Sequence, residues 1–366
     1  MTEREAYVAF NLTDRIGSVR LAALVAEYGS AAAAWEAYPK KLARAGGEID
    51  WRAEFVTAEK FGVSIVTALD AGYPEILRKT EGHPLVLYVK GDVAALSRPS
   101  VALVGTRRAT EYGRHVAGVL AYDLAKAGWS VLSGLALGID AAAHRGALDA
   151  GGVTVGIIGS GLDRFYPEEN RELAREMVRA GGAVVSEFPF GRPADKTTFP
   201  IRNHVVAALA RGVVAVEAPV KSGTLITTGL AAELGRVVMA VPARVDNRMS
   251  AGCLHLIREG ATLVRNADDV LEALAPLGVR ARPDDGARPG EGADEGNSPD
   301  AERPAYSAEE ALIMLHVEED PVSLDDLVRL TKLPAEKVNA LAMTLRLKGF
   351  VKYLPGNRIS RLTARR

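Results

Sequence analysis

The sequence predicts an α/β protein with a Rossmann-like, doubly wound and mostly parallel sheet, preceded by a small helical domain and followed by a winged-helix domain. Three observations support this prediction. Short apolar runs, typical of buried parallel strands, recur through the middle of the chain. From residue 101 onward, helix-length segments separate these runs. Three helical patterns followed by a pair of strands occupy the last part of the sequence, residues 305–366.

Length and composition indicate several globular domains. The chain has 366 residues, more than one hydrophobic core usually accommodates. Hydrophobic residues make up 48% of it and charged residues 25%, an ordinary balance for a folded protein. The formal net charge of −1 excludes a uniformly basic surface. Any site for a polyanion must therefore carry its positive charge locally.

Cysteine usage and the apolar pattern point to a cytoplasmic protein without a metal centre. The single cysteine, Cys253, permits no disulfide within one chain and no thiolate zinc site. The six histidines are scattered without the spacing of metal ligands. The first residues, MTEREAYVAF, do not resemble a signal peptide, and no apolar run approaches the ~18 residues of a membrane span. We expect no cofactor.

The first domain, residues 1–60, is predicted to be helical. Two short helices joined at the turn Ile16-Gly17 would resemble a helix-hairpin-helix or sterile-alpha-motif-like unit, which often contacts DNA through the turn. A plain helical cap that packs on the next domain is the alternative. The alternative is favoured because the turn has no cluster of Lys or Arg.

The second domain, residues 61–277, contains eight apolar runs that we expect to form strands. Right-handed crossovers would place the intervening helices on both faces of the sheet. The runs cover residues 63–67, 85–89, 101–105, 130–134, 153–159, 183–187, 213–218 and 237–243.

The remainder of the chain is predicted to be a linker followed by a third domain. Residues 278–304 are rich in Gly, Pro, Asp and Glu and have almost nothing to bury, as in a disordered linker. In residues 305–366, three helical patterns (307–316, 323–331 and 334–348) precede a hairpin that turns at residues 355–357. This is the winged-helix arrangement, which serves either as a reader of duplex DNA or as a protein-interaction module.

Loops that follow the predicted strands carry the candidate binding residues, because ligands of parallel sheets lie beyond the carboxyl ends of the strands. Glycine there lets backbone amides approach a phosphate, and a following helix N-terminus adds free N–H groups. Each loop alone is more often a tight turn, but several together with arginine favour an anion site. These loops are Gly105-Thr106-Arg107-Arg108, Ser133-Gly134, Gly159-Ser160-Gly161 and Lys221-Ser222-Gly223-Thr224.

Basic and aromatic residues gather in the same loops. Cations there could clamp phosphates, and aromatic rings could stack on unpaired bases, although core packing is the alternative for each ring. The cations are Arg107, Arg108, Arg171, Lys196, Arg202 and Lys221, and the rings are those of Phe165, Tyr166 and Phe199. A Walker phosphate loop is absent from the sequence, and residues 156–161 (GIIGSG) do not match the dinucleotide-binding fingerprint.

Several unusual motifs resemble the DNA processing protein A family, also called Smf. They are VALVGTRRATEYGRHVAGVLAYDLAKAGWSVLSGLALGIDAAAHRGALDAGG, GSGLDRFYPEENRELA, VVSEFPFG, FPIRNHVVAALARGVVAVEAPVKSGTLITTGLAAELGRVVMAVPA and AGCLHLIREGATLV, which together cover roughly residues 63–275. The resemblance implies a cytoplasmic mediator, not an enzyme. It would bind single-stranded DNA and help to load RecA past single-strand-binding protein during recombination and natural transformation.

The resemblance also implies particular site residues. The Arg of the family's G-[ST]-R motif is Arg107, and the basic residue after its Y-P-x-x-N motif is Arg171, where family members commonly have Lys. A homodimer would form near Leu254 and Ile257, where the match to the family is weaker. The complete set of expected nucleic-acid-binding residues is Arg107, Arg108, Gly159, Ser160, Gly161, Asn170, Arg171, Lys196, Arg202, Asn203, Ser222, Gly223 and Thr224.

A nucleotide-binding enzyme of the phosphoribohydrolase type is the alternative. Enzymes of that type carry P-G-G-x-G-T-x-x-E, in which Gly-Thr cradles phosphate and Glu acts on the glycosidic bond. Here Thr227 stands where the Glu is needed, and Glu233 lies more than two helical turns past Thr224. The only nearby carboxylate is that of Glu217.

Overall fold

The computed structural model describes residues 1–13, 16–37, 49–278, 308–314, 316–317, 322–347, 351–354 and 358–361. The chain divides into two compact units, Met1–Ala287 and Arg288–Arg366. Most of the predicted linker (279–304), the hairpin turn (355–357) and the last five residues lie outside the described residues. None of the described helices has the length and apolar character required to cross a membrane.

One sheet organises the first unit. Its described strands follow the order β1-β2-β6-β5-β4-β3-β7-β8-β9. All pairs from β6 to β9 are parallel, whereas β1–β2 and β2–β6 are antiparallel. The strands are β1 (Ser64–Thr67), β2 (Val86–Gly91), β3 (Ser100–Gly105), β4 (Ser130–Ser133), β5 (Thr154–Ile157), β6 (Ala183–Ser186), β7 (Gly212–Glu217), β8 (Val237–Ala240) and β9 (Thr262–Leu263).

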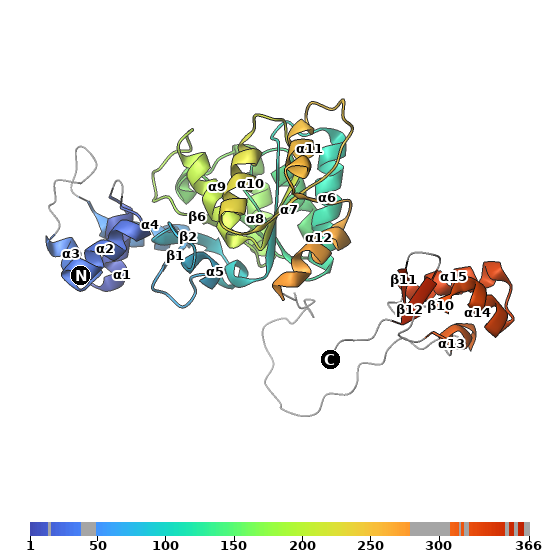
Figure 1. Cartoon of the computed structure of the whole chain (residues 1–366). Coiled ribbons are helices and arrows are strands. Elements are labelled where there is room, and N and C mark those ends of the chain that lie inside the picture. The colour runs from blue at the N-terminus through green and yellow to red at the C-terminus, as the bar shows by residue number, and fades with distance from the viewer. Residues whose placement is uncertain are drawn as a thin grey trace. The chain divides into compact units, whose positions relative to one another are not determined.

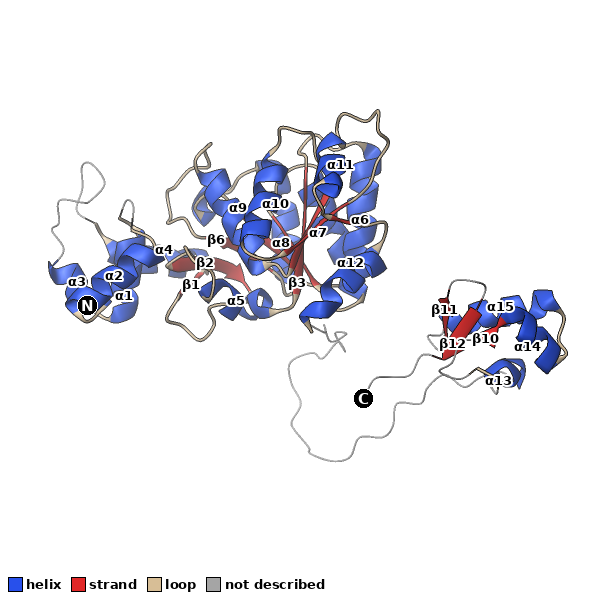
Figure 2. Cartoon of the chain, viewed as in Figure 1, coloured by secondary structure: helices blue, strands red, loops and turns tan. Residues whose placement is uncertain are grey.

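Helices cover both faces of this sheet, which Figure 2 shows as strands enclosed by helices. Alternate residues of β3 enter different cores: Val101 and Leu103 pack with α6, α7 and α12, whereas Ala102 and Val104 pack with α5 and α9. The helices are α5 (Glu75–Arg78), α6 (Glu111–Lys126), α7 (Ile139–Asp149), α8 (Arg171–Arg179), α9 (Thr198–Leu209), α10 (Gly223–Glu233), α11 (Ala251–Arg258) and α12 (Ala267–Leu274). The short 3-10 helices are η2 (Val93–Ser97), η3 (Leu162–Arg164), η4 (Glu168–Asn170) and η5 (Ala275–Leu277).

The predicted doubly wound, mostly parallel fold is thus confirmed, and each of the eight predicted runs overlaps a strand. The sequence did not reveal β9, because a two-residue strand carries no periodicity. It also did not reveal that β1 and β2 run antiparallel to their neighbours.

The N-terminal helices pack against the β1–β2 edge of the sheet, beside which they lie in Figure 1. They are α1 (Glu3–Asn11), α2 (Ser18–Tyr28), α3 (Ala31–Ala37) and α4 (Trp51–Phe61). Thr2 and Glu5 form a capping box that fixes the start of α1. The carboxylate of Glu3 accepts the N–H groups of Ala31 (3.0 Å) and Ala32 (2.9 Å), which ties α1 to the beginning of α3.

The second unit is the predicted winged helix. Its helices α13 (Ala308–Met314), α14 (Leu324–Thr331) and α15 (Ala335–Leu347) surround a small core that includes Leu327, Leu345 and Ile359. Strands β10 (Val322–Ser323), β11 (Val351–Leu354) and β12 (Arg358–Arg361) form an antiparallel sheet in the order β10-β12-β11.

His144 of α7 is fully buried against β4 and β5 and must be neutral. The hydroxyl of Thr154 donates to the carbonyl oxygen of Val131 (2.8 Å), so its oxygen accepts the Nδ1–H of His144 (2.6 Å). The His144 Nε2 has no partner among the described residues. Burial, assisted by the positive charge of Arg202, lowers the pKa of His144 to about 3.

This histidine should steepen the loss of stability in acid. Its pKa is lower in the folded chain than in the unfolded one, so its contribution is complete above about pH 6.5 and is lost as the pH falls toward 3. We expect His144→Asn, which retains a donor for Thr154 but cannot titrate, to reduce the pH dependence of the unfolding free energy by up to about 1.4 kcal/mol per pH unit. Urea unfolding between about pH 4 and 6 measures this slope, and equal slopes in both proteins would contradict the assignment.

Candidate functional site

The candidate site lies where the chain reverses its direction of progress across the sheet. Strands β3 and β7 are neighbours, and the strands that follow them, β4 and β8, lie on opposite sides of the pair. Loops after β3 and β7 therefore diverge and leave a crevice, the usual position of ligands in open α/β sheets. The N–H of Thr106 donates to the carbonyl oxygen of Glu217 (2.7 Å), which holds the two strand ends together at this point.

Arg107 and two aromatic rings form a continuous surface beside the crevice. The exposed Arg107 guanidinium lies 4.5 Å from the ring centroid of Phe199, within the range of a cation–π contact. The ring centroids of Phe199 and Tyr166 are 6.2 Å apart, and Tyr166 is 48% exposed. We call Arg107, Phe199 and Tyr166 the stacking row. It presents a planar cation and two partly exposed π-faces, the groups on which flat aromatic ligands stack.

The cavity beneath the stacking row is too small to enclose a ligand. Gly134, Ala136 and Gly159 help to line it, and its volume is about 20 Å³. A cavity of this size holds about one water molecule. A nucleotide-sized ligand would therefore lie across the stacking row and not inside the cavity.

Three buried side chains hold residues 134–136, which form the floor of the site. Arg202 donates to the carbonyl oxygens of Gly134 and Ile157, the latter at 2.6 Å. Asp140 accepts the N–H groups of Gly134 (3.1 Å) and Ala136 (3.2 Å). The Asn170 amide donates to the carbonyl oxygens of Leu135 (2.9 Å) and Ala136 (3.0 Å). Leu135 itself has a φ of +52°, a conformation that such contacts must stabilise.

Arg202 and Asp140 are two buried groups of opposite charge that interact electrostatically without a direct ion-pair contact. Burial raises the pKa of Asp140, and the nearby Arg202 opposes that rise. Burial also lowers the pKa of Arg202 to about 10, so its guanidinium remains charged at neutral pH. Arg202 and Asn170, expected from the sequence to contact nucleic acid, are both buried and bonded to the loop after β4. They position the floor of the site from below.

Glycine residues allow the strand-end loops to approach one another closely. Gly138 has a φ of +81°, and a Cβ there would collide with the carbonyl oxygen of Thr106. A Cβ on Gly134 would collide with the guanidinium of Arg202. Glycine at both positions is thus needed to keep Arg107 and the floor in place.

The loop after β5 contributes less than its sequence indicated. Gly159 lines the cavity, next to the ring of Phe199. Ser160 is fully buried, and its hydroxyl has no partner among the described residues. The N–H of Gly161 already donates to the carbonyl oxygen of Arg192 (2.8 Å), so it is not free for a phosphate.

Arg171 lies at the start of α8 and lines a different, larger groove from the cavity that Arg107 lines. It makes a two-pronged ion pair with Glu168 (2.5 and 2.6 Å) and lies 5.3 Å from the ring centroid of Phe165. Phe165 directly precedes Tyr166 in the chain, so Arg171 and its ring partner adjoin the stacking row in sequence while they line the other groove.

The remaining predicted residues lie outside the cavity. Arg108 and Lys196 are exposed and make no ion pair within the described part of the chain. Asn203 is partly buried on α9. Ser222, Gly223 and Thr224 begin α10 after β7. Of these three residues only Gly223 is exposed, with open space around it.

Glu217, the carboxylate that an enzyme would need, is hydrogen-bonded to Thr110. It is buried, and its two oxygens accept the backbone N–H and the hydroxyl of Thr110 at 2.8 Å each. Thr110 in turn caps α6 by accepting the N–H of Gly113 (3.0 Å). Glu217 therefore joins β7 to the beginning of α6.

Sequence reasoning missed Asp140 as a functional residue. An acid in the first turn of the helix after β4 was the available signal, because such residues commonly bind the backbone of the preceding loop. The exposed Leu137, which also lines the cavity, carried no signal at all.

Comparisons with known proteins identify the family of the chain. Residues 64–275 match the family described as DNA recombination-mediator protein A, and residues 297–357 match the DprA winged helix domain. The chain is 31% identical to protein Smf of Synechocystis over 98% of this chain and 99% of that protein. It is 45% identical to a putative DNA processing protein DprA of Mycobacterium tuberculosis, over 62% of this chain and 58% of the relative.

Two solved structures are similar to this chain. DNA processing protein A of Streptococcus pneumoniae superposes with a TM-score of 0.61 at 34% identity, covering 74% of this chain and 98% of that one. The protein of the same name from Helicobacter pylori has a TM-score of 0.53 at 30% identity, covering 59% and 98%. The latter structure was described for its single-stranded-DNA binding mode.

Proposed function

The chain belongs to the DNA recombination-mediator protein A family and has a role in DNA recombination, and we propose that it fulfils this role by binding single-stranded DNA across the stacking row. The observation that carries the proposal is the contact of the exposed Arg107 with Phe199, beside Tyr166. The Helicobacter relative, described as binding single-stranded DNA, supports it.

Flat rings favour unpaired bases over duplex. In a single strand the bases expose their faces, and each base stacked on an aromatic side chain contributes about 1–3 kcal/mol. A duplex keeps its base faces covered, so the stacking row offers it only phosphate contacts. Exposed cations near the strand ends, Arg108, Lys196 and Lys221, would hold the backbone without reading its sequence.

We expect tighter binding to a labelled single-stranded oligonucleotide than to the matching duplex, measured by fluorescence anisotropy. Affinity should fall with salt, with a slope of about −0.7 for each phosphate neutralised. Lys196→Ala should reduce the magnitude of this slope by about 0.7, since one phosphate contact is lost. Lys60→Ala, an exposed lysine of α4, is the matched control. Equal affinity for both forms of DNA would exclude the stacking mechanism.

We further propose that the bound strand is handed to RecA in the cytoplasm, past single-strand-binding protein, during recombination and natural transformation. Membership of a family of recombination mediators supports this step. RecA-dependent ATP hydrolysis on oligonucleotides coated with single-strand-binding protein tests it. Without acceleration by this chain, the mediator step would be excluded, while single-strand binding would be unaffected.

A homodimer is proposed through α11. Its Leu254 is partly buried, whereas Ile257 already packs against the cluster that contains Ala218 and Cys253. Of the two residues predicted from the sequence, Leu254 is therefore the better contact. Two protomers would engage two segments of one strand and raise the effective affinity.

Leu254→Glu should weaken dimerisation by at least about tenfold, because it would bury an unpaired carboxylate in the interface. Sedimentation equilibrium measures the change. Val56→Glu, which alters an exposed apolar residue of α4, serves as the control. Parent protein that sediments as a monomer, or a Leu254→Glu protein that still dimerises, would refute this interface.

A further inference from the structure

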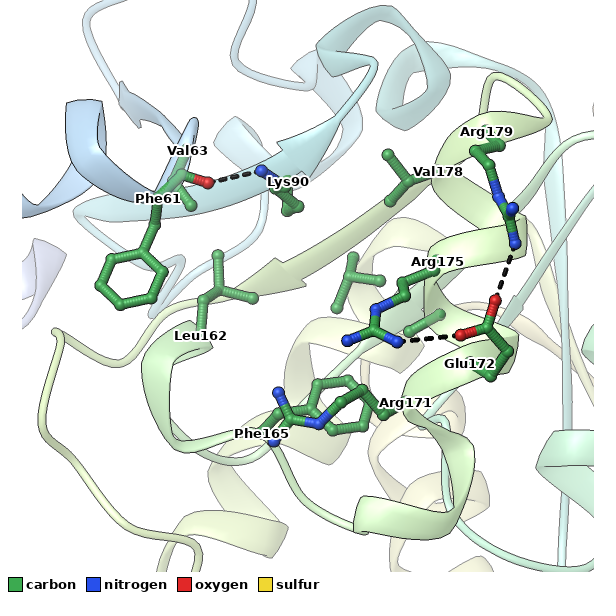
Figure 3. A pocket seen from close by; sticks show the side chains of 12 residues that line it. Phe61, Val63, Lys90, Leu162, Phe165, Arg171, Glu172, Arg175, Val178 and Arg179 are labelled. Atoms are coloured by element: carbon green, nitrogen blue, oxygen red, sulfur yellow. Dashed lines mark hydrogen bonds and ion pairs between the residues drawn. The ribbon is translucent and has the colours of Figure 1, made fainter.

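A groove separate from the stacking row lies on the first unit. It lies between the segment from α4 to β2 and the outer face of α8, with a volume of about 650 Å³. Figure 3 shows Val63, Leu162 and Val178 from three separate segments of the chain around its interior. None of Arg107, Phe199 and Tyr166 lines it. Its volume is in the range of cavities that hold ligands of several hundred daltons.

The interior of the groove is mainly aliphatic. The side chains that form it include Val63, Leu162, Val178 and Val184, and the ring of Phe165 also lines it. Phe61, a further lining residue, is 43% exposed and stacks on Phe190 with 6.0 Å between the ring centroids. The groove therefore offers apolar contacts within a border of charged residues.

The rim of the groove has an excess of positive charge. Four cations line it, Lys90, Arg171, Arg175 and Arg179, against a single carboxylate, that of Glu172. Glu172 is shared by two of them, since it accepts from Arg175 (2.9 Å) and from Arg179 (2.8 Å). One negative charge thus serves two exposed arginines. Arg171 is paired with Glu168, which is not part of the lining. Four cations therefore face two carboxylates, and the remaining excess of two positive charges is complementary to carboxylates.

We propose that this groove binds a short acidic peptide segment of a partner protein. Large apolar side chains of the peptide would occupy the aliphatic interior, and its carboxylates would pair with Arg175, Arg179 and Lys90. Between the rings of Phe61 and Phe165 the lining is aliphatic, and an aliphatic surface favours such side chains over nucleic-acid bases, which stack on flat rings. The proposal concerns a partner other than DNA, on a surface that shares only Arg171 with the residues expected to contact DNA.

A labelled nine-residue peptide with two Leu-Phe pairs among aspartates is the probe, and anisotropy is the measurement. We expect a dissociation constant of about 1–100 μM. Two companion peptides, one with Asn for every Asp and one with Ser for every Leu and Phe, should each bind at least about tenfold more weakly. No binding of the parent peptide up to about 1 mM would overturn the proposal.

Substitutions then locate the peptide. Arg175→Glu reverses an exposed charge, and Val178→Glu places a carboxylate in the interior; each should weaken binding by at least about tenfold. Arg20→Glu, on the exposed face of α2, should leave it unchanged. Equal peptide affinity in Arg175→Glu and the parent would refute the site even if Val178→Glu fails to fold.

The last experiment adds a single-stranded oligonucleotide, both as a competitor of the bound peptide and as a ligand of the Arg175→Glu variant. It should neither displace the peptide nor lose affinity in Arg175→Glu. Displacement together with such a loss would show that the groove is a continuation of the DNA site, and the peptide proposal would be wrong. Arg171 is left intact in all these variants, because it also adjoins the proposed path of DNA.

Discussion

Replacing Arg107 with alanine should weaken binding to single-stranded DNA by about ten- to a hundredfold. The variant loses a charged donor, which contributes about 1.5–3 kcal/mol, and it loses the planar group that extends the face of Phe199. Folding should be nearly unaffected, because Arg107 is exposed and has no ion pair among the described residues; such surface changes alter stability by at most about 0.5 kcal/mol.

Two further variants separate charge from stacking. Arg107→Lys keeps the positive charge but not the planar guanidinium, so its affinity should lie between those of the parent and Arg107→Ala. Arg20→Ala removes an equally exposed arginine from α2 and should bind like the parent. Anisotropy titrations and thermal melts of all four proteins suffice. If Arg107→Ala binds as tightly as the parent, the stacking row is not the DNA site.

Replacing Arg202 with methionine should destabilise the first unit by about 3–5 kcal/mol. The methionine retains length but leaves the buried Asp140 without its opposite charge, and removal of one partner of a buried pair typically has an effect of this size. The carbonyl oxygens of Gly134 and Ile157 also lose their donor. Urea unfolding measures the change, with Arg20→Met as the control on α2.

A second substitution identifies the cause of that loss. Arg202→Met combined with Asp140→Asn removes the unpaired charge while keeping an acceptor for the N–H groups of Gly134 and Ala136, so part of the stability should return. Where Arg202→Met does not fold at all, Arg202→Lys still gives a graded loss. A loss below about 1 kcal/mol in Arg202→Met would mean that the pair is not a structural support.

The sequence revealed the fold largely because continuous apolar runs identify buried parallel strands. The direction of each strand was harder to predict from the sequence. Between β1 and β2 lies only the short helix α5, and nothing in residues 68–85 distinguishes a return from a crossover. Strand β9 was missed because two residues are too few to show a periodic pattern.

The site was predictable only where position along the chain determines exposure. Arg107 directly follows a strand at the carboxyl edge, so its placement was readable from the sequence. Arg202 and Phe199 lie in one helix, and which of them points outward depends on how α9 packs on the sheet. The structure buries Arg202 and leaves part of Phe199 accessible, an outcome that charge and hydrophobicity alone would reverse.

Recognition by a few cations and flat rings on a chain of net charge −1 has a consequence inside a cell. Chromosomal duplex offers a large excess of non-specific sites there, and proteins with dense positive surfaces bind to them. At physiological ionic strength charges are screened beyond about 8 Å, so this chain attracts duplex only weakly from a distance. Under the proposed function we therefore expect the stacking row to lose few copies to duplex, so that they are available when a short-lived stretch of exposed strand appears.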